Sequence, residues 1–309
     1  MRYALNTQQI MWLVCATLLP GTAAMSWLYG IGIWWNLAWL IVFCVLVEVS
    51  CQLLSGRNQG LRNSLSDGTT WVSAWLMAIC LPPMTTMWVL GVASMAAIAL
   101  AKHAYGGTGR NVFNPAMVGY AVVLVSFPQQ LMHWPQAAVD GLTGATLLSE
   151  FKYRTGLTMN EFASLYSEQM NQQTIVALAF AAGGVVLLYM KVIAWRIPLA
   201  VFAGVALAAL LGYDGGSSSS LGSVWFHITT GGLVAGAFFV ATDPVTHPSS
   251  ARGQWLFGIV VGVLTYLIRG LGSFPDGFAF AILLGNCATP LLNRWHRHQL
   301  QATTPQAEQ

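Results

Sequence analysis

Charged residues are scarce in this sequence. They make up 7% of its 309 residues, whereas 56% of the residues are hydrophobic. Soluble domains carry about 25% charged residues. A water-soluble fold of this length could not bury so much apolar surface, so the composition indicates a chain solvated by lipid. The net charge of +3 is too small to indicate a nucleic-acid partner.

The sequence also lacks paired cysteines. All five cysteines lie in apolar stretches, and no two form a Cys-x-x-Cys pair. This pattern argues against a disulfide framework or a cluster site within the chain. We interpret Cys15, Cys44, Cys51, Cys80 and Cys287 as small buried apolar side chains.

Ten apolar segments are candidate membrane spans, since a helix needs about 20 residues to cross a bilayer. The third is short and ends at Pro82-Pro83, so we expect it to be broken or tilted; joining it to the fourth as one kinked helix would give nine spans. The first is expected to be a retained span rather than a cleaved signal peptide. The ten lie near 10–29, 34–54, 70–82, 84–102, 114–132, 174–190, 197–212, 224–241, 255–270 and 274–292.

The basic residues favour ten spans over nine. With ten spans and the N-terminus inside, ten basic residues are cytoplasmic and three are outside, which accounts for all 13. Such an excess on one side is what the positive-inside rule expects. The cytoplasmic set is Arg2, Arg57, Arg62, Lys102, Arg110, Lys191, Arg196, Arg252, Arg294 and Arg297, and the outer set is Lys152, Arg154 and Arg269.

We therefore predict an all-α polytopic membrane protein of the bacterial inner membrane, with about ten transmembrane helices and both termini cytoplasmic. Five spans on each side of a long loop would give two inverted five-helix halves. The long loop is expected to be periplasmic and functional, because loops of this length usually are. The predicted boundaries are 1–132 for the first membrane half, 133–173 for the outer loop, 174–292 for the second membrane half and 293–309 for a cytoplasmic tail.

The long loop contains the string Asp-Gly-Leu-Thr-Gly-Ala-Thr at 140–146. It resembles the Asp-x-x-Ser/Thr-Gly-Ala-Thr signal read by a periplasmic flavin transferase, which takes FMN from FAD and joins it to a threonine hydroxyl as a phosphoester. The motif therefore predicts a covalent FMN on Thr146, with Asp140, Thr143, Gly144 and Ala145 as the flavinylation signal. The small residues leave room for an enzyme to approach. We expect no metal site and no residue that is catalytic alone.

Three carboxylates near the expected cytoplasmic side are candidates for an ion path. Glu48 lies inside the second span, where a charge is costly and often functional. It could handle an ion, or it could reach the interface and pair with a loop arginine. Asp67 suits a helix N-cap and Asp243 a turn, and either could instead line a cation path. Tryptophans near the expected interfaces, Trp134 among them, are interpreted as membrane anchors rather than flavin contacts.

With the motif, four further segments resemble the RnfD family, a membrane component of the Rnf electron transport complex, also called Rsx, over nearly the whole chain. The similarity to NqrB of the sodium-pumping NADH:quinone reductase is more distant. That relative has a longer cytoplasmic N-terminal region, which favours the Rnf type here. The segments are Met11–Cys15 with Leu19-Pro20-Gly21, Ser66–Thr70, Gly109–Ala116 and Ala241–Thr246.

The resemblance implies a membrane electron relay. Such complexes move electrons between ferredoxin and NAD and couple them to sodium or proton transport; in some enteric relatives they keep a redox-sensing regulator reduced. The chain would be a redox-active component whose FMN, near the outer side, exchanges electrons with flavin-bearing RnfG. RnfA, RnfB, RnfC and RnfE and a flavin transferase are the other implied partners. Some relatives also hold riboflavin in the membrane, and no motif here places it.

Two other functions fit parts of the sequence. A quinone-reducing component like NqrB would share the flavinylation motif. A solute transporter or channel without a redox role would fit the inverted halves, Glu48 and the broken third span. The motif at 140–146 separates the redox functions from transport.

Overall fold

The computed structural model describes residues 5–56, 66–131, 133–135, 143–274 and 276–303. Within these ranges the chain is predominantly helical, which confirms the predicted class, and each of the ten predicted spans overlaps a helix. Five helices are long and apolar enough to cross a membrane, namely Thr7–Tyr29, Gly32–Leu54, Met87–Tyr105, Ser167–Tyr189 and Ala251–Leu271. Three shorter apolar helices are Thr69–Cys80, Pro115–Ser126 and Arg196–Gly212.

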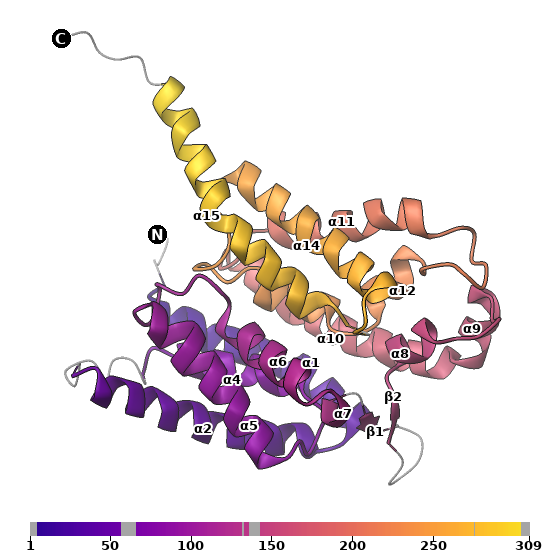
Figure 1. Cartoon of the computed structure of the whole chain (residues 1–309), viewed down its shortest axis with the longest axis horizontal. Coiled ribbons are helices and arrows are strands. Elements are labelled where there is room, and N and C mark those ends of the chain that lie inside the picture. Colours follow the sequence, from indigo (N-terminus) through magenta and orange to yellow (C-terminus); the bar gives the residue numbers. More distant parts are fainter. Residues whose placement is uncertain (1–4, 57–65, 132, 136–142, 275, 304–309) are drawn as a thin grey trace.

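The helices form two groups joined by the long loop (Figure 1). The first half contains α1 Thr7–Tyr29, α2 Gly32–Leu54, α4 Thr69–Cys80, α5 Met87–Ser94, the π-helix η2 Met95–Lys102, η3 His103–Tyr105, α6 Pro115–Ser126 and α7 Pro128–Leu131. The second half contains α10 Ser167–Tyr189, α11 Arg196–Gly212, α12 Val224–Thr229, α13 Leu233–Ala235, the π-helix η4 Gly236–Val240, α14 Ala251–Leu271 and α15 Phe278–Thr303. Helix α15 thus continues through the first part of the predicted tail.

The long loop contains more structure than its sequence predicts. Its two ends pair as a short antiparallel ribbon of β1 His133–Pro135 and β2 Thr143–Ala145, with His133 opposite Ala145. Helices α8 Leu147–Lys152 and α9 Met159–Leu165 follow. The segment near 160–170 forms α9 and the first turn of α10.

Local signals in the sequence account for several helix starts. Asn6 and Gln9 form a capping box at α1, in which each side chain accepts from the other residue's backbone N–H. Asn114 caps α6, and Pro115 occupies its first turn, where no backbone donor is needed.

Residues 70–102 form a helical hairpin rather than one kinked helix. At one end, Asn36 of α2 donates to the Pro82 carbonyl at 2.7 Å and accepts from the Thr85 backbone N–H at 3.1 Å. At the other end, Thr70 of α4 and Lys102 of η2 both contact Glu48 of α2. Helices α4 and α5–η2 therefore run in opposite directions along α2, and the proline pair makes the turn between them.

Glycines allow helices to pack closely, both between the halves and within them. Helix α1 packs on α10 and α6 on α15. A Cβ at Gly21 would collide with the Phe180 ring, and one at Gly183 with the Thr17 carbonyl. Small residues at such contacts are typical of membrane helices, whose association depends on close packing rather than on expulsion of water.

The outward surface of the helices is apolar. Large apolar side chains are exposed on many elements of both halves; among the most exposed are Trp27, Leu54, Tyr189, Leu210 and Leu211. Exposed apolar area on this scale marks a surface that something other than water covers. Together with the span lengths, it indicates a membrane protein.

Candidate functional site: a cavity between the two halves

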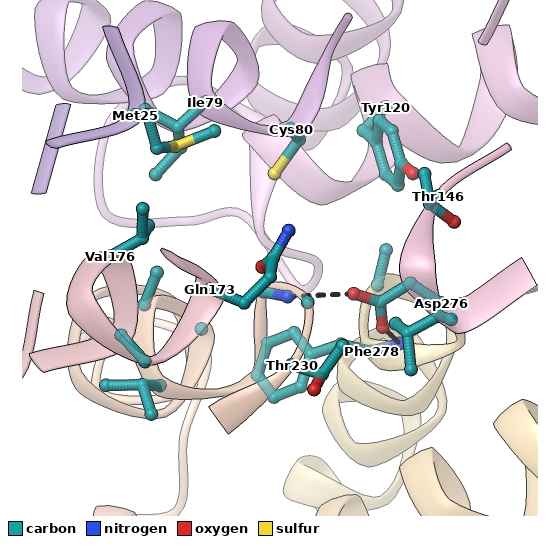
Figure 2. A pocket seen from close by; sticks show the side chains of 18 of the residues that line it. Met25, Ile79, Cys80, Tyr120, Thr146, Gln173, Val176, Thr230, Asp276 and Phe278 are labelled. Atoms are coloured by element: carbon teal, nitrogen blue, oxygen red, sulfur yellow. Dashed lines mark hydrogen bonds between the residues drawn. The ribbon is translucent and has the colours of Figure 1, made fainter. Parts of the chain in front are cut away.

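A cavity separates the two halves at the end of the molecule where α8 and α9 lie, which we call the loop end. About 1280 Å³ of atom-free space lies within it, and this volume includes space that is open to solvent. Figure 2 shows Met25, Ile79 and Cys80 of the first half facing Val176 and Phe278 of the second. Apolar and aromatic side chains make most of its wall.

Thr146 lies at the wall of this cavity (Figure 2). It is the N-cap of α8, and its Oγ1 accepts a hydrogen bond from the Ser149 backbone N–H at 3.2 Å. The residue is half-buried. The sequence suggests a hydroxyl on an open loop, whereas the structure fixes this hydroxyl at the start of a helix and beside a cavity.

Helix α8 is anchored to the second half. Leu147, Leu148 and Phe151 pack in a buried cluster with residues of α9 and α12. Lys152 Nζ donates to the carbonyls of Gly272 and Phe274, in the connection between α14 and α15. Partial burial lowers the pKa of Lys152. These contacts hold Thr146 in a defined place relative to the second half.

The eighth predicted span is interrupted beside the cavity. Helix α12 ends at Thr229, and α13 starts at Leu233. Gly231 has φ +73°, and a Cβ there would lie 2.9 Å from both Asp276 Oδ2 and Arg269 Nη2. The glycine pair explains a break that we did not predict, because only a residue without Cβ combines this conformation with so close an approach.

An ion pair closes the cavity wall at this break. Asp276 Oδ1 accepts from Arg269 Nε and Nη2, both at 3.2 Å, and Oδ2 accepts from the Gly232 backbone N–H at 3.0 Å. The carboxylate satisfies a backbone donor that the break exposes.

Further polar groups line the cavity. Tyr29 of α1 accepts a hydrogen bond from Gln173 of α10, which links the halves. Trp134 packs edge-on against Tyr29, with ring centroids 5.1 Å apart. Trp134, which the sequence suggests as a membrane anchor, also lines the cavity. Thr230 is 1% exposed, and its hydroxyl has no hydrogen-bond partner in the part of the chain that the structure describes.

The rest of the predicted flavinylation signal is described in part. Thr143, Gly144 and Ala145 form β2, which leads directly into Thr146. Asp140 lies outside the described residues. The cavity residues of the second half carry no motif, although Pro275-Asp276-Gly277 and the Gly231-Gly232 pair are the sequence features that could have pointed to them.

Glu48 lies at the opposite end of the molecule, which we call the distal end. Its carboxylate is fully buried, with Lys102 Nζ at 3.0 Å, His103 Nε2 at 3.0 Å and Gln52 Nε2 at 3.0 Å. Lys102 also donates to Thr70 Oγ1 at 3.2 Å. Lys102, which the sequence places at the cytoplasmic end of the fourth span, is buried against Glu48. The arginines of the loop after α2, the expected partners of Glu48, lie outside the described residues.

Asp67 and Asp243 also lie at the distal end. Asp67 Oδ1 accepts from the Thr69 backbone N–H at 2.8 Å, one residue before the N-cap Gly68. Asp243 Oδ2 accepts from Asn114 Nδ2 at 3.4 Å and Thr246 Oγ1 at 3.2 Å. Burial raises the pKa of Asp243, although its hydrogen bonds oppose this.

Asn114 and Asn286 join the halves near Asp243. The Asn114 backbone N–H donates to Asn286 Oδ1 at 3.0 Å, across the contact of α6 with α15. Asn286 Nδ2 and Thr289 Oγ1 both donate to the Thr246 carbonyl, at 3.2 and 2.9 Å. We call Asn114, Asp243, Thr246, Asn286 and Thr289 the distal latch. The three predicted ion-path residues are thus spread over two polar clusters, neither of which lines the cavity.

Comparison with known proteins agrees with this architecture. The model of the NQR2, RnfD, RnfE family matches residues 1–301. A protein of Ectopseudomonas mendocina, named as the D-type subunit of an ion-translocating oxidoreductase complex, is 39% identical to the chain over 94% of the chain and 91% of the relative. The protein of the same name from Pseudomonas aeruginosa strain PAO1 is also 39% identical, over the same shares of the two chains. That of Vibrio cholerae strain N16961 is 34% identical over 93% of each. The chain belongs to the NQR2, RnfD, RnfE family.

Proposed function

We propose that this chain is the membrane subunit of an ion-translocating electron transport complex, and that it relays electrons through an FMN joined to Thr146 as a phosphoester. The relatives are named as a subunit of an ion-translocating oxidoreductase complex. The flavin attachment is supported by the motif at 140–146 and by the place of its last threonine.

The observation that carries the proposal is that Thr146 lines the cavity between the halves. A group attached to this hydroxyl has a mostly apolar space beside it. The residues present fit a flavin ring, which needs apolar faces and a few polar partners at its edge. Thr230 supplies a buried hydroxyl without a partner among the described residues, and Asp276 supplies a charged acceptor.

The chain's own contribution is position and electrostatics, while FMN supplies the one- and two-electron chemistry when bound. The α8 anchor fixes the attachment point, and the Arg269–Asp276 pair places fixed charge beside the cavity. A redox subunit needs these features, and it does not need an acid or base of its own.

The charge distribution supports a periplasmic loop end. The sequence places ten basic residues on one side and three on the other. This excess of basic residues on one side is the bias that the positive-inside rule uses. On this basis the inner membrane holds ten spans with both termini cytoplasmic, and residues 133–173 face the periplasm, where the transferase acts.

The same reasoning assigns the partners. A flavin at one edge of the membrane can be one station in a longer electron path, so electrons must pass to carriers in other subunits, with RnfG as the proposed neighbour in an Rnf-type complex. A quinone-reducing role of the sodium-pumping type would use the same Thr146 and differ in the final electron acceptor.

The proposal is tested by producing the full chain together with a flavin transferase and examining denaturing gels for fluorescence. We expect a fluorescent band for the wild type and none for Thr146→Asn, which keeps an N-cap side chain but removes the hydroxyl. Thr158→Ala is the matched control, because Thr158 caps α9 in the same loop and lies outside the motif. It should stay fluorescent.

A transporter without a redox role is the second candidate, since a cavity between two halves that are joined at the distal end also suits a solute site. A wild-type chain that carries no flavin under these conditions would overturn the redox proposal and favour transport.

A further inference from the structure

The two carboxylate oxygens of Asp276 have unequal partners. Oδ1 accepts from Arg269 Nε and Nη2 and from the Phe278 backbone N–H at 3.1 Å. Oδ2 accepts from the Gly232 backbone N–H, and no further donor to it is found within the described residues. A carboxylate offers about four acceptor positions in all. Oδ2 therefore keeps room for another donor, and Asp276 lines the cavity with 27% of its side chain exposed (Figure 2).

Arg269 cannot easily turn away from this carboxylate. Its side chain is 1% exposed, and Nη1 donates to the His227 carbonyl at 2.7 Å while Nε and Nη2 hold Asp276. The Phe278 and Gly232 backbone donors restrain the carboxylate from the other side. The position of Asp276 is thus determined by three separate elements before any ligand binds, which is the condition for precise recognition.

A second unused polar group lies in the same wall. The Thr230 hydroxyl is buried without a partner among the described residues, and Thr230 directly precedes the glycine pair that contacts Asp276. A buried hydroxyl without a hydrogen bond is unfavourable, so this group calls for a partner. One free acceptor and one free hydroxyl, in a wall otherwise mostly apolar, fit a flat ring whose edge alternates N–H and carbonyl groups.

We propose that Asp276 is the positioning residue for the imide edge of the flavin ring, with Oδ2 accepting from the imide N–H and Thr230 donating to a neighbouring carbonyl. This inference rests on the proposed function, because it takes the ring to enter the cavity from Thr146. It goes further in assigning the recognition of the ring to the break in the eighth span.

The proposed contacts have opposite effects on reduction of the ring. Reduction adds two electrons and one proton, and at neutral pH it leaves extra negative charge near the imide edge. A fixed carboxylate beside that edge opposes the added charge, whereas a hydroxyl donor stabilises it. Asp276→Asn should therefore make the ring easier to reduce, and Thr230→Val should make it harder.

The test is a spectroelectrochemical titration of the purified full chain after flavinylation, with in-gel fluorescence to show that the flavin is attached. We expect Asp276→Asn to favour reduction by about tenfold, a rise of about 30 mV in the midpoint potential for a two-electron couple. Thr230→Val should shift the potential in the opposite direction by a smaller factor and move the flavin absorption band. Asp276→Glu, which keeps the charge, should restore most of the wild-type value.

Asp243→Asn is the control, because it removes a half-buried carboxylate at the distal end and should leave the potential unchanged. An attached flavin whose potential is the same in the wild type and in Asp276→Asn would overturn this inference and leave the proposed function intact. Asp276→Asn leaves Arg269 unpaired, and the variant could therefore fail to accumulate. In that case Thr230→Val tests the inference, and an unchanged potential and absorption spectrum in Thr230→Val would overturn it. A wild type without covalent flavin would instead overturn the proposed function.

Discussion

The loop end and the distal end bring the same two halves together in opposite ways. At the loop end a cavity separates them, and its wall contains polar groups with unused hydrogen-bonding capacity, Thr230 and Asp276. At the distal end, hydrogen bonds of the latch cross directly between the halves. The Glu48–Lys102 pair lies in a cluster of hydrogen-bonding partners.

This contrast separates the structural from the functional use of buried polar groups. Polar side chains in the membrane interior are costly unless they are paired. At the distal end, Glu48 and the side chains of the latch are paired within the protein, so stability explains them. Gln52 Oε1 beside Glu48 is the exception, since it is buried without a partner among the described residues. The loop-end groups are paired in part, so they call for a ligand. The donors around a buried carboxylate therefore say more about its role than its chemical type does.

The largest expected effect comes from unpairing the distal charge. Lys102→Met should leave Glu48 buried without its lysine, and loss of one partner of a buried pair typically costs about 3–5 kcal/mol. We expect a large drop in the thermal unfolding midpoint of the detergent-solubilised chain. Lys191→Met, at an exposed lysine, is the matched control and should change little. Equal midpoints for the two variants would show that the Glu48 cluster is not a stabilising element.

A medium effect is expected at the contact of α1 with α10, which joins the two halves. Gly183→Ala should push α10 away from α1, because the new methyl group would collide with the Thr17 carbonyl. Overpacking of this kind costs about 1–3 kcal/mol. Gly91→Ala adds the same methyl group to α5, where nothing lies within 4 Å. Thermal unfolding should separate the two variants, and a Gly183→Ala chain as stable as Gly91→Ala would contradict the close packing of the halves.

The smallest effect concerns the pH dependence of the latch. Since burial raises the folded-state pKa of Asp243, the folded state holds that proton more tightly than the unfolded state. The wild type should therefore lose stability as pH rises from the unfolded value, about 3.9, through the folded pKa. Asp243→Asn removes this loss, so the free energy of unfolding of the variant should rise relative to that of the wild type as pH rises over that range. Parallel unfolding curves across that range would show that Asp243 titrates normally.

The sequence predicted the helices well, because apolar length and proline positions are local signals. Pro82-Pro83 marked the turn of the α4–α5 hairpin, and Asn114-Pro115 marked the start of α6. It did not predict the break at Gly231-Gly232, since a glycine pair in an apolar run also suits a tightly packed continuous helix. The conformation there depends on Asp276, 44 residues away along the chain.

The sequence predicted one residue of the candidate site and did not indicate the others. Thr146 belongs to a contiguous motif, so the sequence could single it out. Thr230 and Asp276 line the same cavity only when α12, α14 and α15 are packed together. Glu48 was identified as unusual, but its partner Lys102 is 54 residues away and was interpreted as a charge at the cytoplasmic end of the fourth span. Composition and motif spacing do not show which residues far apart along the chain come into contact.

The most direct test of the account is the mass of the chain produced with a flavin transferase, followed by fragmentation of the peptide that contains residues 140–146. We predict a mass increase of one FMN less one water, localised to Thr146, and an unmodified chain for Thr146→Asn. An unmodified wild type, or an FMN attached to any other residue, would contradict the claim that Thr146 carries the flavin beside the cavity.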